Sequence, residues 1–327
     1  MKRNIIAILL LIIISFLSCK KDSELKDPIE LQGAVFGTSY TIIYYDQEIN
    51  FDTEIQQYFA EINQSLSTYI PTSDISRINR GEEGIKVDGY FREVFEKSAR
   101  IYKETNGYFD PTVGNLVNAW GFGPKEQLNN LDPNKVKELM NFVGFNKVSI
   151  RNDEVIKQSP EIYFDFNAVA KGYGIDVISR FLESKGVKNY LVEIGGEIRT
   201  RGEKPEGKSW VVQLDNPNTD GSRSAYDIIR IKDKAMASSG NYRKFRIAEN
   251  GEKFVHTINP KTGNAKESNL LAATVIANLD CADVDAYATA FMAMGLEKTK
   301  LFIENRSDLE VILIYVNESG ELNEFRK

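Results

Sequence analysis

Apolar residues recur every three or four positions in several stretches of the chain, which is the spacing of one face of an α-helix. The stretches are residues 55–66, 91–102, 136–140 and 175–182. Asp132-Pro133 supplies the third with a capping residue and a first-turn proline. Gly107 and Gly186 follow the second and fourth as stop signals. A further helix, rich in small residues, is predicted over residues 284–294.

Runs of β-branched and aromatic residues predict strands between these helices. The runs cover residues 36–45, 190–194, 210–214, 227–231, 270–277 and 309–316. Strands and helices mix without a steady βαβ alternation, which favours an α+β fold over a doubly wound sheet. Because no repeat, low-complexity tract or clean linker divides the 327 residues, we expect one large domain or two intimately packed lobes.

The N-terminus has the pattern of an export signal. Lys2 and Arg3 precede an apolar run, residues 5–14, and Ser18-Cys19 then resembles the end of a bacterial lipobox. We predict a lipoprotein signal peptide over residues 1–18, lipidation of Cys19, a polar tether over 19–30 and a domain over 31–327. The alternative is an uncleaved N-terminal anchor. Both place the domain in the cell envelope, facing the periplasm, and they leave the choice between inner and outer membrane open.

Composition excludes several classes of protein. The single histidine, His256, rules out sites that need a pair of histidines, and two cysteines cannot build a cysteine-rich zinc site or a disulfide framework. A net charge of −6 argues against non-specific nucleic-acid binding. If Cys19 carries lipid, Cys281 is the only thiol left, and we expect it to be buried and inert.

Two segments carry glycines where a ligand could approach the backbone. Residues 105–124 combine glycines and prolines with aromatic side chains, which suits a flat, phosphate-bearing cofactor or, equally, a packed aromatic loop. In residues 163–176, Asp165 ends a predicted apolar strand and Lys171-Gly172 opens a helix, a place that favours anions. Taken alone, Lys171 fits a surface helix position better. The segment matches neither a P-loop nor a G-x-G-x-x-G fingerprint.

Two more segments carry groups that could do chemistry. His256 stands in a turn-forming H-T-I-N-P-K-T-G sequence, although a lone histidine is more often structural. Asp285, Ala288 and Thr289 lie at positions i, i+3 and i+4 of the last predicted helix, hence on one face. A carboxylate beside a hydroxyl offers hard oxygen ligands of the kind that Mg²⁺ takes. The alternative is an aspartate near a helix start and a threonine in the core.

Taken in order, these segments resemble the ApbE family of FAD:protein FMN transferases. The motifs are G-T-S-Y, L-S-T-Y-I-P-T-S-D-I-S-R-I-N, F-D-P-T-V-G-N-L-V-N-A-W-G-F-G-P, A-K-G-Y-G-I-D, E-I-G-G-E-I-R, S-S-G-N-Y-R, H-T-I-N-P-K-T-G and D-A-Y-A-T-A. They run from Gly33 to Gly295. The resemblance implies an ApbE-like, T-fold-related α+β domain of two packed lobes, with antiparallel or mixed sheets and flanking helices.

The resemblance also implies roles for individual residues. Asp285 and Thr289 match side-chain ligands of Mg²⁺, and Ala168 and Ala288 match regions of main-chain contact. FAD contacts are implied for Phe36, Tyr69, Tyr108, Phe109, Asp110, Asp165, Lys171 and Ile258. Phe36 stands where many relatives have Met, and Asn259 stands where Asp is commoner.

His256 matches the histidine that the family is thought to use in catalysis, and an unperturbed imidazole can accept a proton near neutral pH. The implied reaction splits FAD, attaches FMN to a threonine of an acceptor protein through a phosphoester and releases AMP. Acceptors would be subunits of a Na⁺-pumping quinone reductase, an Rnf-type complex or an extracytoplasmic reductase. The alternatives are a periplasmic FAD pyrophosphatase, which gives FMN and AMP, and a non-enzymatic flavin-binding lipoprotein.

Overall fold

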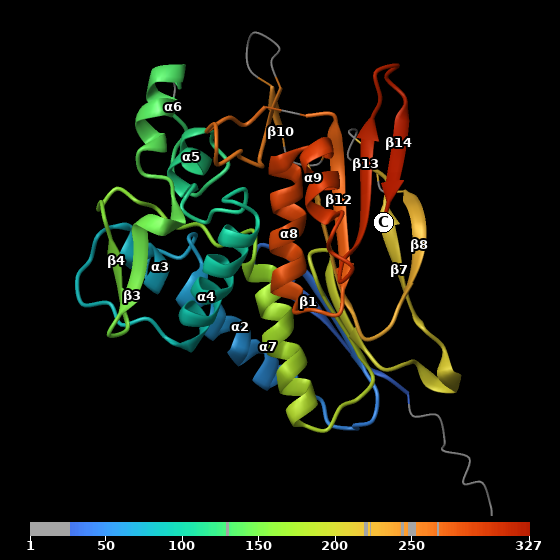
Figure 1. Cartoon of the computed structure of the whole chain (residues 1–327). Coiled ribbons are helices and arrows are strands. Elements are labelled where there is room, and N and C mark those ends of the chain that lie inside the picture. Colours follow the sequence, from blue (N-terminus) through green and yellow to red (C-terminus); the bar gives the residue numbers. More distant parts are fainter. Residues whose placement is uncertain are drawn as a thin grey trace, which may run out of the picture.

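The computed structural model describes residues 27–128, 131–218, 222, 224–242, 245–247, 253–266 and 268–327. An eight-stranded sheet forms its centre, in the order β1-β2-β5-β6-β9-β12-β13-β14, and every neighbouring pair of strands in it is antiparallel (Figure 1). The predicted signal peptide, Cys19 and most of the tether lie outside the described residues. No helix within the described part is long and apolar enough to cross a membrane.

The strands of the central sheet are β1 (Ile29–Val35), β2 (Thr38–Tyr44), β5 (Tyr190–Ile194), β6 (Glu197–Arg201), β9 (Ala235–Gly240), β12 (Leu270–Ala277), β13 (Glu310–Val316) and β14 (Leu322–Arg326). Three separate hairpins are formed by β3 (Val148–Arg151) with β4 (Glu154–Lys157), β7 (Trp210–Asp215) with β8 (Ala225–Ile231), and β10 (Phe245–Ile247) with β11 (Lys253–Val255).

The helices are α2 (Asp52–Leu66), α3 (Asp74–Asn79), α4 (Gly89–Glu104), α5 (Gly114–Ala119), α6 (Pro133–Met140), α7 (Ala170–Ser184), α8 (Cys281–Met294) and α9 (Leu296–Ile303). Two short 3₁₀ turns, η1 (Phe145–Lys147) and η2 (Pro205–Gly207), complete the elements. Asp132 caps α6 as its sequence predicts, because its side chain accepts the backbone N–H groups of Asn134 and Lys135.

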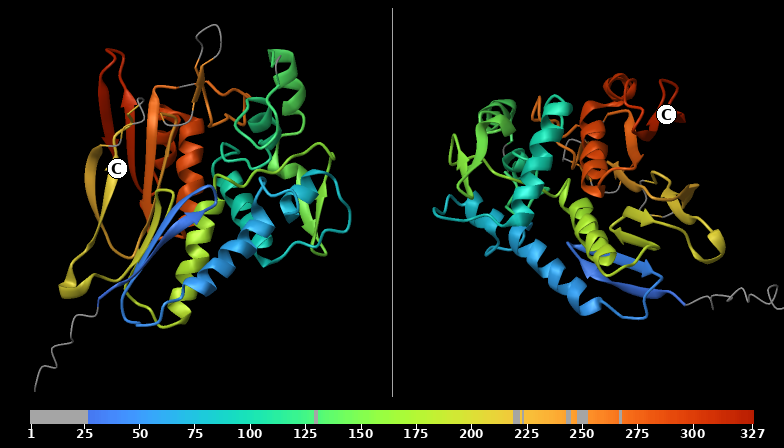
Figure 2. Two further views of the ribbon diagram at one scale, coloured as in Figure 1. Left: turned by 180° about the vertical axis from the view of Figure 1, so that it is seen from behind. Right: turned by 60° about the horizontal axis from the view of Figure 1, so that its bottom comes forward.

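Both faces of the central sheet are covered. Alternate side chains of β12 point to opposite sides, so Ala273 and Val275 join the core that the helices share, whereas Ile276 packs with Trp210 of the β7–β8 hairpin. Views from behind and below show the hairpin on the side of the sheet away from α7 and α8 (Figure 2). This double burial explains why the β12 sequence is almost continuously apolar, although antiparallel strands usually alternate.

A smaller apolar cluster forms a second lobe around α5 and α6. It unites Leu116, Phe122 and Val136 with Ile258 from the loop that follows β11. This cluster is separate from the main core, which is built on α2, α4, α7, α8 and the sheet. The arrangement agrees with the expected α+β domain of two packed lobes.

Three local predictions need correction. Phe36 does not lie in a strand: it occupies the β1–β2 turn with φ 51°, and β2 begins at Thr38. The segment before Asp165 is not a strand either, because Tyr163 makes only an isolated bridge to Val113 and the rest is irregular. The last small-residue helix starts three residues earlier than predicted, at Cys281. The other predicted helices and strands are present.

Candidate active site

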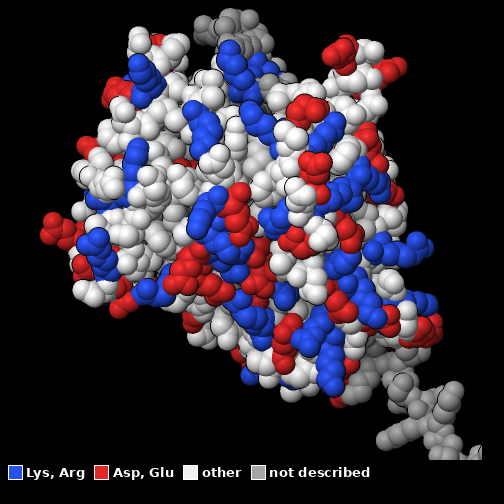
Figure 3. Space-filling view, in the orientation of Figure 1, with Lys and Arg blue, Asp and Glu red and all other residues white. Residues whose placement is uncertain are grey.

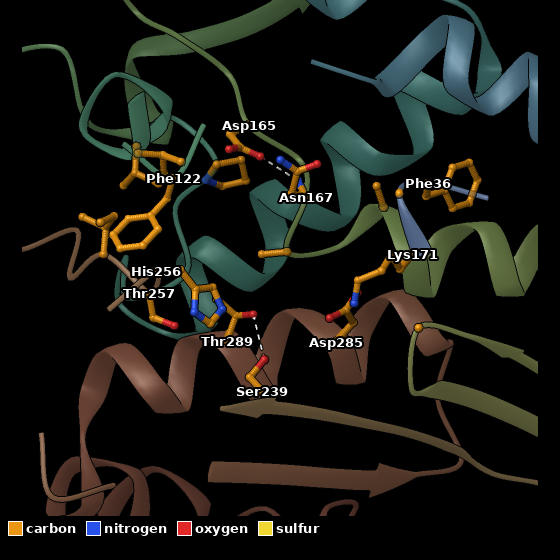
Figure 4. A pocket seen from close by; sticks show the side chains of 18 of the residues that line it. Phe36, Phe122, Asp165, Asn167, Lys171, Ser239, His256, Thr257, Asp285 and Thr289 are labelled. Atoms are coloured by element: carbon orange, nitrogen blue, oxygen red, sulfur yellow. Dashed lines mark hydrogen bonds between the residues drawn. The ribbon is translucent and has the colours of Figure 1, made fainter. Parts of the chain in front are cut away.

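A cavity of about 900 Å³ opens between the main core and the second lobe. The residues with predicted roles that line it are Phe36, Tyr69, Tyr108, Phe109, Asp110, Asp165, Ala168, Lys171, His256, Ile258, Asp285 and Thr289. Figure 4 shows Asp165 across the cavity from Asp285 and Thr289. Ala288 is fully buried one position before Thr289 and is not part of the wall. Cys19 lies outside the described residues.

Helix α8 supplies a carboxylate and a hydroxyl one turn apart. Asp285 and Thr289 both project from α8 toward the cavity (Figure 4). The Asp285 carboxylate is 3% exposed and accepts the backbone N–H of Gly172 at 3.2 Å. The Thr289 hydroxyl lies 3.1 Å from the Ser239 hydroxyl of β9. Both oxygen groups are therefore held by neighbouring elements before any ligand binds.

Lys171, in the first turn of α7, is paired within the cavity and is not the surface residue that its local sequence suggested. Its ammonium lies 2.6 Å from the carboxylate of Glu197, the first residue of β6. Burial raises the pKa of Glu197 to about 7, against the opposing effect of Lys171. Burial acts to lower the pKa of Lys171, but Glu197 and Asp285 outweigh it and hold that pKa above its usual value. A cation thus faces two carboxylates here.

The start of α7 can reach α8 only because residue 172 is glycine. A Cβ atom there would lie 2.4 Å from the backbone oxygen of Cys281. Cys281 itself is fully buried, as its sequence suggested, and burial raises the pKa of its thiol well above the usual value. Direct backbone contact between the two helices brings Lys171 and Asp285 to the same end of the cavity.

The opposite wall is built from loops. Tyr108, Phe109 and Asp110 follow α4, and the Asp110 carboxylate accepts both the hydroxyl of Thr112, at 2.6 Å, and its backbone N–H, at 2.9 Å. Burial raises the pKa of Asp110 to about 6, although these hydrogen bonds act to lower it. The Thr112 hydroxyl in turn accepts the N–H of Gly144 at 2.7 Å. Hydrogen bonds, rather than a helix or strand, hold this part of the wall.

His256 immediately follows β11 in a tight loop. Its ring stands edge-on to that of Phe122, with the ring centroids 6.5 Å apart. Asn259 anchors the loop, because its amide nitrogen donates to the carbonyl of Ala293 near the end of α8, at 3.1 Å. Trp120 adds a second anchor by donating to the carbonyl of Gly263 at 2.9 Å. An ionised aspartate could not donate to Ala293, so Asn259 serves as a structural tie in this chain.

The oxygen donors of the cavity fit a hard cation better than a soft one. Asp285 and Thr289 offer a carboxylate and a hydroxyl, and Ala168 lines the same cavity. Within the described ranges, no three His, Cys, Asp or Glu side chains gather as a metal-binding group. Mg²⁺ binds proteins through one or two carboxylates and fills its remaining positions with water and phosphate, so this donor set is compatible with it.

Among the polar residues of the wall that were not predicted as site residues, two contact predicted ones directly. Glu197 lies in the E-I-G-G-E-I-R motif and Ser239 in S-S-G-N-Y-R, and both line the cavity. Their motifs were visible in the sequence. Their contacts with Lys171 and Thr289 were not, because each pair is joined only when the sheet packs against the helices.

Comparison with known proteins gives a consistent picture. The family model described as ApbE family matches residues 36–313. The chain is 33% identical to the FAD:protein FMN transferase of Haemophilus influenzae, covering 94% of this chain and 91% of that protein. It is 31% identical to the FAD:protein FMN transferase of Escherichia coli strain K12, covering 87% of this chain and 83% of that protein.

Two solved structures have the same fold. The flavin transferase ApbE from Vibrio cholerae superposes with a TM-score of 0.81 at 32% identity, covering 92% of this chain and 97% of that one. The flavinyl transferase ApbE of Pseudomonas stutzeri, in its apo form, gives a TM-score of 0.81 at 26% identity, covering 94% of this chain and 96% of that one.

Proposed function

Because the chain belongs to the ApbE family, we propose that it is a Mg²⁺-dependent FAD:protein FMN transferase. In this reaction a threonine oxygen of an acceptor protein bonds to the phosphorus of the FMN half of FAD. The bond from that phosphorus to the bridging oxygen breaks, and AMP leaves with the electron pair. The threonine proton passes to a base. FMN is then attached to the acceptor through a phosphoester.

One observation carries this proposal: titratable side chains from three distant parts of the chain meet in a cavity that also has an aromatic wall. Lys171, Asp285 and His256 line the same space as Tyr108 and Phe109. Aromatic rings provide apolar and stacking surface for a flavin. Lys171, together with a cation held by Asp285, would neutralise the negative charge of a pyrophosphate. A volume of about 900 Å³ is within the range of cofactor sites.

Each residue has a defined task in this proposal. Asp285 and Thr289, with the backbone at Ala168, would hold Mg²⁺, which would supply positive charge to neutralise phosphate oxygens. Lys171 binds a phosphate oxygen after exchanging its contact with Glu197. His256 takes the threonine proton, since the unprotonated nitrogen of a neutral imidazole can accept one. Ile258, Phe36 and Tyr69 provide further side-chain contacts to the flavin.

The test incubates the purified protein with FAD and Mg²⁺, with and without an acceptor domain that carries the target threonine. AMP release is quantified, and flavin fluorescence on the acceptor is followed in a denaturing gel. Transfer predicts AMP and labelled acceptor in equal amounts. AMP without labelling identifies an FAD pyrophosphatase instead, and FAD binding with neither product identifies a flavin-binding protein.

We also propose that the protein is lipid-anchored through Cys19 on the periplasmic side of the cell envelope, where it would act on a subunit of a Na⁺-pumping quinone reductase, an Rnf-type complex or an extracytoplasmic reductase. The support is the basic and apolar pattern of residues 1–18. Metabolic labelling with palmitate tests the anchor: label should enter the wild type and be absent from Cys19→Ala. Equal labelling of both would refute it.

A further inference from the structure

Helix α8 begins without the usual local cap. Asp280 occupies its N-cap position, but the Asp280 side chain makes no capping hydrogen bond. Asp176 of α7 provides one instead: its two carboxylate oxygens accept the backbone N–H groups of Cys281, at 2.8 Å, and Ala282, at 2.9 Å. Two of the N–H groups that every helix leaves unpaired at its start are thus satisfied by a different helix.

The capping carboxylate is itself fixed from the sheet. Asp176 is fully buried, and Arg199 of β6 donates to it at 2.6 Å and to Asp280 at 2.9 Å. Lys97 of α4 holds the other oxygen of Asp280 at 2.6 Å. Acidic and basic side chains mingle on the face of the molecule where α4, α7 and α8 meet (Figure 3). The cap therefore depends on α4, α7 and β6 together.

This arrangement locks α7 and α8 at two points along α7. At Gly172 the backbones touch, and the Gly172 N–H bonds to Asp285. About one turn further along α7, the Asp176 carboxylate accepts hydrogen bonds from the first turn of α8. Asp285 lies one turn after the capped residues of α8, and Thr289 lies one turn beyond that. A shift of α8 along its axis would carry both oxygen donors away from Ala168 and Lys171.

We propose that Asp176, held by Arg199, is a positioning residue that fixes the α7–α8 crossing and thereby sets the affinity of the Asp285–Thr289 site for Mg²⁺. This inference rests on the proposed function, since it assumes that these residues hold the metal. It gives Asp176 no contact with FAD or the reacting atoms: neither Asp176 nor Arg199 lines the cavity. Asp176 acts only through the helix that it caps.

Direct metal binding without FAD tests this inference. Mg²⁺ binding is measured by calorimetry and Mn²⁺ binding by electron paramagnetic resonance, on wild type, Asp176→Asn and Arg199→Met. We expect the dissociation constants to rise by about tenfold or more in Asp176→Asn, because an amide keeps one acceptor oxygen and faces the helix start and Arg199 with N–H donors. Arg199→Met keeps the Asp176 carboxylate as the cap but removes the side chain that fixes its position. The metal dissociation constant is therefore expected to rise by about threefold.

Arg180→Met is the matched control. Arg180 lies one turn beyond Asp176 on the same helix, and its ion pair, 3.0 Å to Glu93, joins α7 to α4 rather than to α8. Metal affinity in this variant should equal that of the wild type. A second control places Asp176→Asn in an Asp285→Asn background, where the further loss of metal affinity should be smaller than in the wild-type background, because Asp176 acts in part through the position of Asp285.

The outcomes separate the possibilities. A lower melting temperature of Asp176→Asn with an unchanged metal dissociation constant would show a structural cap only and overturn the inference, as would equal losses in Asp176→Asn and Arg180→Met. If Asp176→Asn does not fold, an unchanged affinity in Arg199→Met overturns it. Absence of metal binding in the wild type would contradict the proposed Mg²⁺ site as well, whereas acceptor labelling tests the transferase proposal separately.

Discussion

The two walls of the cavity are built by different means. The helical wall places Lys171, Asp285 and Thr289 on α7 and α8, whose backbones touch at Gly172. The loop wall presents aromatic side chains and His256 from segments without regular structure, held by single hydrogen bonds such as that from Asn259 to Ala293. Lys171 and Asp285 thus lie where the backbones of two helices touch, whereas Asp110 and Asp165 lie on irregular segments.

This difference has a physical reason. A carboxylate and an ammonium with little access to water must be oriented closely to compensate for lost hydration, and packed helices provide that orientation. A flavin ring needs an apolar surface of the right shape, which tolerates small shifts. The loop that bears His256 lies outside regular secondary structure, as binding and catalytic segments often do.

Removing the carboxylate of the helical wall should have the largest effect. Asp285→Ala is expected to lower transfer by about 10³-fold at millimolar Mg²⁺, because an uncompensated pyrophosphate would accumulate charge. The Mg²⁺ concentration for half-maximal AMP release should rise sharply. Glu297→Ala, which removes an exposed acid from α9, is the control. Wild-type activity of Asp285→Ala in excess chelator would contradict the metal assignment.

The corresponding change in the loop wall is His256→Ala. Loss of a general base should lower acceptor labelling by at least about 10²-fold, while the dissociation constant for FAD, followed by flavin fluorescence, stays within about threefold. Equal losses in FAD binding and transfer would indicate that His256 orders the loop instead. Full transfer activity in the variant would remove it from catalysis.

The buried acid of the loop wall predicts a pH effect on stability. The pKa of Asp110 is raised to about 6 in the folded protein, above that of an aspartate in an unfolded chain. Between about pH 4 and 6 this group binds more protons when folded, so its contribution to the free energy of unfolding falls as pH rises.

Asp110→Asn should remove this fall. Asparagine keeps an acceptor oxygen for Thr112, so the free energy of unfolding of the wild type minus that of the variant should decrease by about 1–3 kcal/mol from pH 4 to pH 7. Urea denaturation at several pH values measures it. Parallel pH profiles of the two proteins would show that Asp110 does not titrate in this range.

The smallest expected effect concerns the hydrogen bond from Asn259 to Ala293, which joins the two walls. Asn259→Ala removes the hydrogen bond to Ala293 and should cost about 1 kcal/mol of stability, with FAD binding weakened several-fold. Asn317→Ala is the matched control, because Asn317 accepts backbone N–H groups in the β13–β14 turn, far from the cavity. It should cost similar stability and leave FAD binding unchanged. If FAD binding is equally unaffected in Asn259→Ala, the tie is not needed to shape the cavity.

Local patterns in the sequence predicted the main helices and most long strands. The spacing of apolar residues from Ile55 to Leu66 and the cap at Asp132 depend on neighbouring residues only. They can therefore be recognised in the sequence without knowing the fold. Short strands such as β6 and β9 were missed, because each forms only when partners distant in sequence supply its hydrogen bonds. The segment before Asp165 was predicted as a strand but is irregular. Its apolar residues enter the core without pairing with a neighbouring strand.

The sequence by itself determined the family, through ordered motifs, and it identified 12 of the residues that line the cavity. Only the tertiary structure decided how they act together: Lys171 pairs with Glu197, Ser239 with Thr289, and Asp176 caps a helix that begins 105 positions later along the chain. The physical reason is that hydrogen bonds and ion pairs depend on distance in space, and an antiparallel sheet brings distant segments together in an order that local composition does not encode.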